Sequence, residues 1–154
     1  MPDASVMQKL RHYCAYQERC HSEVRGKCLE LGLRGEALEE AIALLIADNF
    51  LNEERFAKAF AGGYFRTRQW GRKKILSALK QRQISAYCIK VGMKEIDEED
   101  YWRVLIQLGE KKYNTLKGDT VLKRKYKTMQ FLIQRGFEPE LANEALEQII
   151  NTPS

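Results

Sequence analysis

The segment VRGKCLELGLRGEALEEAI, residues 24–42, contains the pattern that decides the fold. It predicts a helix that ends at Gly32, a short turn, and a second helix with apolar residues every three or four positions. The same pattern returns as ILSALKQRQISAYCIKVGM at 75–93 and TMQFLIQRGFEPELANEAL at 128–146, with offsets of 51 and 53 residues. Apolar residues coincide in all three copies: Cys28, Leu79 and Leu132; Leu33, Ile84 and Phe137; Ile42, Met93 and Leu146. The chain therefore consists of tandem helical repeats.

Each repeat is too short to bury much surface alone, so neighbouring repeats should supply the rest of its core. No useful stretch alternates between apolar and polar residues as a half-buried strand does. We expect an all-α protein with about nine helices, built as an elongated array of three tandem three-helix repeats. The predicted repeats are 1–50, 51–96 (strongly basic) and 97–154.

Several residues predict where helices begin and end. Ser22, Asn52 and Asp97 have side chains that cap helix N-termini. Gly136 should close one helix and Pro139 should open the next. The acidic run at 97–100 is interpreted as a helix start, because four consecutive acids on a helix point in different directions and make a poor metal site.

Charge is concentrated in the middle of the chain. Residues 1–50 carry a net charge of −2, residues 51–94 carry +9, and residues 95–154 carry −2 again. Such a block indicates a polyanion or an acidic protein surface as partner. Charge alone leaves open the alternative of a solvated face that aids solubility.

The candidate binding residues are basic side chains of the second and third repeats. Tyr113 and Tyr126 interleave those of the third repeat, and we expect both groups to form one continuous stripe. The candidates are Arg66, Arg68, Arg72, Lys73, Lys74, Arg82, Lys111, Lys112, Lys123, Arg124, Lys125 and Lys127.

Arg72, Lys73 and Lys74 begin a predicted helix, where cations oppose the helix dipole by about 0.3–1 kcal/mol each. We interpret this helix start as an anion-binding site. The alternative for the lysines is an exposed helix face opposite the apolar positions. For Arg66 and Arg68 the alternative is a capping role, in which each side chain interacts favourably with the C-terminal end of its own helix.

Trp70 and Arg55 are expected to have structural roles. Trp70 should fill a seam between helices, although its ring is also able to stack on a base. Arg55 should form a local salt bridge near Glu53 and Glu54 rather than contact a ligand.

Nothing in the sequence supports catalysis, a cofactor or a metal. With only His12 and His21, a nucleophile–histidine arrangement has few candidates, and both phosphate-loop motifs are absent. The four cysteines show no C-x-x-C spacing, which favours buried thiols in a reducing cytoplasm over a zinc site. Neither a long apolar run nor a secretion signal is visible, so we expect a cytoplasmic protein without a membrane partner.

The block LLIADNFLNEERFAKAFAGGYFRTRQWGRKKILSALKQRQIS, residues 44–85, resembles the central part of the RecX family of RecA-regulating proteins. HSEVRGKCLELG and LIQRGFEPELANEAL are similar to that family's opening and closing repeats. Gln83 stands where the family usually has glycine, so a different turn geometry is expected there. The positions that carry the resemblance are Leu51, Glu53, Glu54, Arg55, Phe56, Ala57, Arg66 or Arg68, Gly71, Ile75, Leu79 and Ile84.

The resemblance implies a small, monomeric, non-enzymatic bacterial protein made of three-helix repeats. Such proteins bind RecA and its filament on single-stranded DNA, within the helical groove. They inhibit ATP hydrolysis, strand exchange and filament extension, and so modulate DNA repair and the SOS response. Contact with single-stranded DNA itself is expected to be weaker, whether direct or indirect.

Two other functions stay open. One is a DNA-binding module, because CLELGLRGEALEEAI resembles a helix–turn–helix; three glutamates in its second helix, Glu36, Glu39 and Glu40, argue against direct reading of DNA. The other is a helical scaffold for peptides, which leaves the basic block unexplained.

Overall fold

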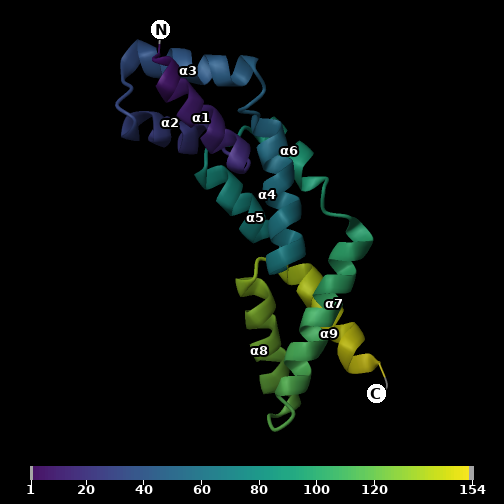
Figure 1. The fold of residues 1–154 in the computed structure, drawn as a ribbon. Helices are drawn as coiled ribbons and strands as arrows, with labels where there is room; N and C mark the ends of the chain where they lie inside the picture. Colours follow the sequence, from purple (N-terminus) through teal and green to yellow (C-terminus); the bar gives the residue numbers. More distant parts are fainter. Residues whose placement is uncertain (1, 153–154) are drawn as a thin grey trace. The chain divides into compact units, whose positions relative to one another are not determined.

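The computed structural model describes residues 2–152, which form nine α-helices and no strand (Figure 1). This confirms the predicted all-α class. The helices are α1 (Ala4–Tyr16), α2 (His21–Glu30), α3 (Gly35–Ala47), α4 (Glu53–Arg68), α5 (Arg72–Gln81), α6 (Ala86–Met93), α7 (Glu98–Thr115), α8 (Val121–Gln134) and α9 (Pro139–Asn151). Within residues 2–152, no helix has the length and apolar character needed to cross a membrane.

The same turn follows α2, α5 and α8, the helices that open the three aligned segments. In each copy a backbone N–H just past the helix reaches back to the carbonyl five residues earlier, which closes the helix end. The bonds run from Leu33 to Cys28 at 2.9 Å, from Ile84 to Leu79 at 3.2 Å and from Phe137 to Leu132 at 3.1 Å. These are the residues that the sequence alignment pairs, so the internal repeat is structural.

The residue before each of these donors adopts a left-handed backbone. Gly32 has φ +89°, Gly136 has φ +100° and Gln83 has φ +60°. The different geometry expected at Gln83 is therefore wrong. A side chain in this conformation costs about 1–2 kcal/mol, and the repeat retains the turn despite that cost.

Most of the predicted helix boundaries are confirmed. The side chain of Asn52 accepts a hydrogen bond from the Arg55 N–H at 2.9 Å, and Asp97 accepts one from the Asp100 N–H at 3.0 Å. Pro139 is the first residue of α9.

The Ser22 cap is wrong. The second helix begins two residues earlier than a Ser22 cap implies, at His21, with Cys20 at the N-cap position. The reason is the carboxylate of Glu23, which accepts the Cys20 N–H at 2.9 Å and so fixes the earlier start.

Contacts divide the chain into two compact units. One contains residues up to Phe60 together with Leu79–Gly92, and the other contains Ala61–Ala78 together with the chain from Met93 onward. The division falls within α4 and within α5. The three-repeat boundaries at residues 50 and 96 remain a prediction.

The core of the first unit lies among α1, α2 and α3 and includes Leu10, Val24, Leu45 and two thiols, Cys14 and Cys28. Cys20 is buried as well, whereas Cys88 is only half-buried, so the expectation of buried thiols holds for three of the four cysteines.

In the second unit α7, α8 and α9 pack on one another (Figure 1). Their largest fully buried side chains are Tyr101 and Phe137, whose ring centres lie 5.2 Å apart. This bundle supports the basic segment between α4 and α5, because that segment belongs to the same unit.

Candidate protein and nucleic-acid interface

The start of α5 is already capped by the protein itself. The N–H of Arg72 donates to the hydroxyl of Tyr101 at 2.9 Å, and the N–H of Lys73 donates to the carbonyl of Gly136 at 2.9 Å. A helix N-terminus binds an anion through such free N–H groups. Two of these groups are occupied within the fold, so the anion site at this helix start stays a prediction that depends on the side chains of Lys73 and Lys74.

Arg72 belongs to a structural network. Its guanidinium contacts Glu138 at 3.0 Å and Glu98 at 2.7 Å, and lies 3.9 Å from the centre of the Tyr101 ring. The Tyr101 hydroxyl in turn donates to Glu138. Burial raises the pKa of Tyr101, so the phenol keeps the proton that it donates. These contacts join the start of α5 to α7 and to the N-cap residue of α9, whereas a partner contact by Arg72 stays a prediction.

Lys73 and Lys74 remain available to a partner. Both are exposed, and neither forms an ion pair with any described residue. The ammonium of Lys74 lies 4.6 Å from the centre of the Trp70 ring, and that ring stacks on Tyr64 at 4.4 Å. Trp70 is half-buried, so it fills its seam only partly and supports an exposed lysine.

Arg66 and Arg68 lie exposed in the last turn of α4, as the sequence predicts. The carbonyl of Arg68 accepts a hydrogen bond from Arg135, which fixes the end of the helix. Their own guanidinium groups form no ion pair with a described residue. Both therefore join Lys73 and Lys74 as exposed cations of the second unit.

Arg55 and Arg82 lie in the first unit. Arg55 forms a salt bridge as predicted, but its partner is Glu18 at 2.7 Å rather than Glu53 or Glu54. Arg82 is half-buried, with its guanidinium 4.7 Å from the centre of the Phe60 ring. The continuous stripe across repeats two and three remains a prediction.

The candidates on α7 and α8 divide into two groups. Three of them have partners within the fold: Arg124 donates to the Tyr113 carbonyl at 2.9 Å, Lys127 pairs with Asp119 at 2.8 Å, and Lys112 lies 5.4 Å from the Phe131 ring. The hydrogen bond from Lys127 holds the pKa of Asp119 below its ordinary value. Lys111, Lys123 and Lys125 form no ion pair with any residue between 2 and 152.

An exposed apolar stripe on α8 is the main feature that sequence reasoning missed. Leu122, Tyr126 and Ile133 are 78%, 65% and 39% exposed. Their spacings of four and seven place them on one helix face, while Thr128 and Leu132 on another face are fully buried. Periodicity in VLKRKYKTMQFLIQ groups these residues on one face, but only the burial of Thr128 and Leu132 shows that this face is the exposed one.

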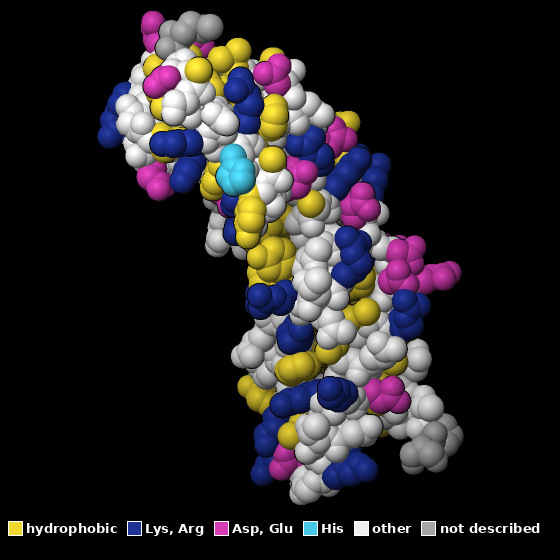
Figure 2. Space-filling model, in the orientation of Figure 1, with side chains coloured by type: hydrophobic (Ala, Val, Ile, Leu, Met, Phe, Trp, Pro, Cys, Tyr) yellow, Lys and Arg dark blue, Asp and Glu magenta, His cyan; other side chains and the backbone are white. Residues whose placement is uncertain are grey.

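Basic side chains flank the stripe. By helical position, Lys123 lies to one side of it and Lys125 to the other. Figure 2 shows dark blue and yellow side chains close together over α8. This mixed surface fits a partner that offers both apolar contacts and negative charge.

Family models match two long parts of the chain. Residues 52–93 match the second three-helix domain of RecX, and residues 98–146 match the third. The chain belongs to the RecX family. The two matches also agree with a fold of tandem three-helix repeats.

Curated RecX proteins match over most of the chain. "Regulatory protein RecX" of Clostridium perfringens strain 13 is 31% identical over 135 residues, covering 86% of this chain and 63% of that protein. The protein of the same name from Chlorobium limicola is 29% identical over 136 residues, covering 87% of this chain and 84% of that protein. The chain thus spans less than two thirds of the length of some curated RecX relatives.

The crystal structure of RecX from Lactobacillus salivarius shows the same fold. Its TM-score is 0.87 with 20% sequence identity, and the alignment covers 97% of both chains. At this identity the likeness concerns the fold alone.

Proposed function

We propose that this chain is a non-enzymatic regulator of the RecA recombinase. It binds RecA and the RecA filament on single-stranded DNA, in the helical groove of the filament. By occupying the groove it inhibits ATP hydrolysis, strand exchange and filament extension, and so modulates DNA repair in the cytoplasm. Family membership supports the regulatory role, and the mixed surface of the second unit supports a filament as the partner.

The observation that carries this proposal is the composition of α8. Naked nucleic acid is bound chiefly through cations and stacked aromatic rings. The exposed aliphatic residues Leu122 and Ile133 add nothing to phosphate binding, and they fit a protein surface. A filament of protein on DNA supplies the apolar contacts and the negative charge together.

The test is the single-stranded-DNA-dependent ATPase of the cognate RecA, titrated with this protein. The wild type should inhibit at well below one molecule per RecA. Two variants should lose inhibition: Lys73→Glu/Lys74→Glu, which reverses exposed charges on α5, and Leu122→Ser/Ile133→Ser, which removes the apolar part of the α8 stripe.

Lys90→Glu/Lys94→Glu is the matched control, because it makes the same charge change at two other exposed lysines. It should inhibit like the wild type. All variants should unfold at the wild-type temperature, since none of the changed side chains is buried. Absence of inhibition by the wild type at every ratio would overturn the proposed function.

Direct binding of nucleic acid is the second candidate, favoured by Lys73, Lys74, Lys123 and Lys125, which form no ion pair with any residue between 2 and 152. Affinity for a single strand that falls steeply with salt would indicate phosphate contacts. If such binding occurs without any effect on the RecA ATPase, this second function replaces the first.

A further inference from the structure

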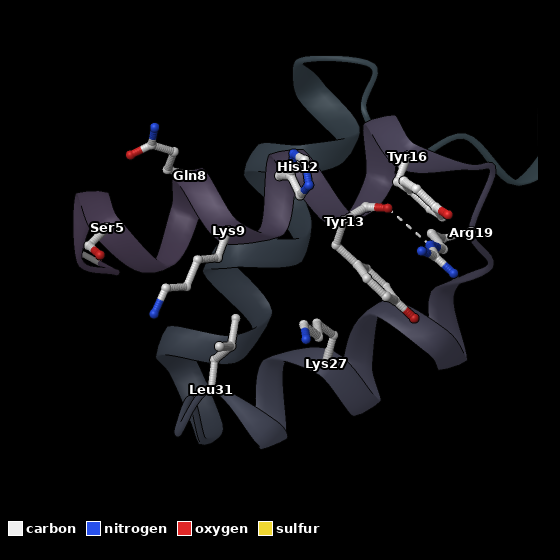
Figure 3. A pocket seen from close by; sticks show the side chains of 9 residues that line it. All are labelled: Ser5, Gln8, Lys9, His12, Tyr13, Tyr16, Arg19, Lys27 and Leu31. Carbon is white, nitrogen blue, oxygen red and sulfur yellow. Dashed lines mark hydrogen bonds between the residues drawn. The ribbon is translucent and has the colours of Figure 1, made fainter.

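We propose a second binding site, in the first unit, for a nucleotide segment of single-stranded nucleic acid. Between α1 and α2 lies an open cleft of about 500 Å³ (Figure 3), a volume usual for small-ligand sites. Six of its lining side chains carry the argument: Lys9, His12, Tyr13, Tyr16, Arg19 and Lys27. None of its nine lining residues is acidic.

The cleft concentrates positive charge in an otherwise acidic region. Residues 1–50 carry a net charge of −2, with six basic residues, and three of those six line this one cleft. Lys9 and His12 form no ion pair with any described residue. Lys27 contacts Glu30 at 3.5 Å, but that carboxylate is 69% exposed and does not line the cleft. An anion entering the cleft therefore meets cations and no carboxylate among the lining residues.

Tyr13 and Arg19 contact each other within the cleft. The Arg19 Nε–H donates to the Tyr13 carbonyl at 3.0 Å, and its guanidinium carbon lies 3.7 Å from the centre of the Tyr13 ring. The ammonium of Lys27 lies 5.5 Å from the same ring centre. Only one of the five guanidinium N–H groups of Arg19 is used in these contacts, so the others are available to a phosphate.

Tyr16 provides an aromatic surface at one end of the cleft. It is 77% exposed in the last turn of α1, and Figure 3 shows it beside Arg19, away from Lys9. Exposed aromatic rings next to cations are the usual means by which proteins hold single strands, with bases stacked on rings and phosphates on Lys or Arg. The geometry thus places a base on Tyr16 and the neighbouring phosphates on Arg19, Lys27 and Lys9.

An acidic peptide would satisfy the cations but leave the ring of Tyr16 unused. A free nucleotide shares the required chemistry, yet the spread of cations along the open cleft suits a continuing strand with several phosphates. This site lies outside the basic middle of the chain and does not depend on RecA.

Fluorescence anisotropy of a labelled oligothymidylate, measured without RecA, tests the site. Tyr16→Ala should weaken binding about five-fold or more. Lys9→Glu should weaken it too, and should make the dependence of affinity on salt less steep. Tyr87→Ala and Lys90→Glu are matched controls, since both residues are exposed on α6 and neither lines the cleft. These two variants should bind like the wild type.

Photocrosslinking locates the strand. An oligonucleotide carrying 5-iodouracil should crosslink to the peptide that contains Tyr16. Wild-type affinity in both cleft variants, or crosslinks found only around Tyr126, would overturn the proposal. Competition by thymidine monophosphate as strong, per nucleotide, as by the oligomer would overturn the single strand in favour of a free nucleotide. Because this assay contains no RecA, its failure leaves the proposed regulation of RecA untouched.

Discussion

Gly71 lacks a side chain because another segment of backbone occupies the space where a side chain would begin. A Cβ built on Gly71 would lie 2.2 Å from the carbonyl carbon of Gly136 and 2.2 Å from the nitrogen of Phe137. The close approach lets the N–H of Gly71 reach the carbonyl of Arg135 at 2.7 Å. At the residue scale, this contact joins the start of α5 to the end of α8.

Gly71→Ala should therefore destabilise the protein by about 2–4 kcal/mol, because backbone must move to admit the methyl group. Urea unfolding followed by circular dichroism measures the change. Gly63→Ala is the control: it lies within α4 with no atom within 4 Å of the added Cβ, so it should be neutral or stabilising by up to about 1 kcal/mol. Equal stability of the two variants would show that the contact between Gly71 and Gly136 does not form.

The ion-pair partners of Arg72 lie far from it in the sequence. Its place in an RKK run indicates a ligand contact, yet its partners Glu98 and Glu138 lie 26 and 66 residues further along the chain. Helical periodicity carries no information on pairs so far apart. Lys73 and Lys74 form no ion pair with a described residue. Both are exposed, as the sequence predicts.

At the element scale, the end of α5 uses a turn that normally takes glycine. Gln83 occupies it with φ +60°, at the position equivalent to Gly32 and Gly136. The N–H of Ile84 still reaches the Leu79 carbonyl at 3.2 Å, so the helix end keeps its closing bond. Gln83 is exposed, so replacing its side chain leaves no cavity in the core.

Gln83→Gly should stabilise the protein by about 1 kcal/mol, since glycine adopts this backbone without steric cost. The midpoint of thermal unfolding measures it. Lys80→Gly also introduces glycine, but at an exposed position inside α5, and it should destabilise the protein by about 1 kcal/mol. A loss of stability in both variants would contradict a left-handed Gln83.

The features of the interface helices α4, α5 and α8 differ in how far the sequence predicts them. Arg66 and Arg68 at the end of α4 follow from the position of the helix boundary alone. The two faces of α8 follow from periodicity once Thr128 and Leu132 are known to be buried. The occupied N-terminus of α5 does not follow, because the groups that cap it come from Tyr101 and Gly136.

At the scale of the whole molecule, buried thiols link stability to pH. Burial raises the pKa of Cys14, Cys20 and Cys28 above the ordinary thiol value. In the unfolded chain these thiols ionise at their ordinary pKa, while in the folded protein they remain protonated to higher pH. The buried thiols therefore contribute fully to the free energy of unfolding below the thiol pKa of the unfolded chain. This contribution is lost as the pH rises toward the higher thiol pKa values of the folded protein.

We expect the free energy of unfolding to fall between about pH 8 and about pH 10. Urea unfolding at a series of pH values under reducing conditions measures the slope. Because the cause is burial rather than surface charge, the slope should change little with added salt. Stability that is constant or rises over this range would contradict ionisable thiols in the core.

The sequence by itself determined the helical class, the threefold repeat, most helix boundaries and the positions of the exposed cations on α5. These depend on interactions within a few residues: helix hydrogen bonds, caps and the five-residue closing turn. Only the tertiary structure decided that Arg72 pairs with Glu98 and Glu138, that the α5 start is capped, and that cations of α1 and α2 share a cleft with Tyr16. The physical reason is that these features join side chains and backbone groups far apart in the chain, and local periodicity specifies that such residues are buried or exposed but not which of them meet.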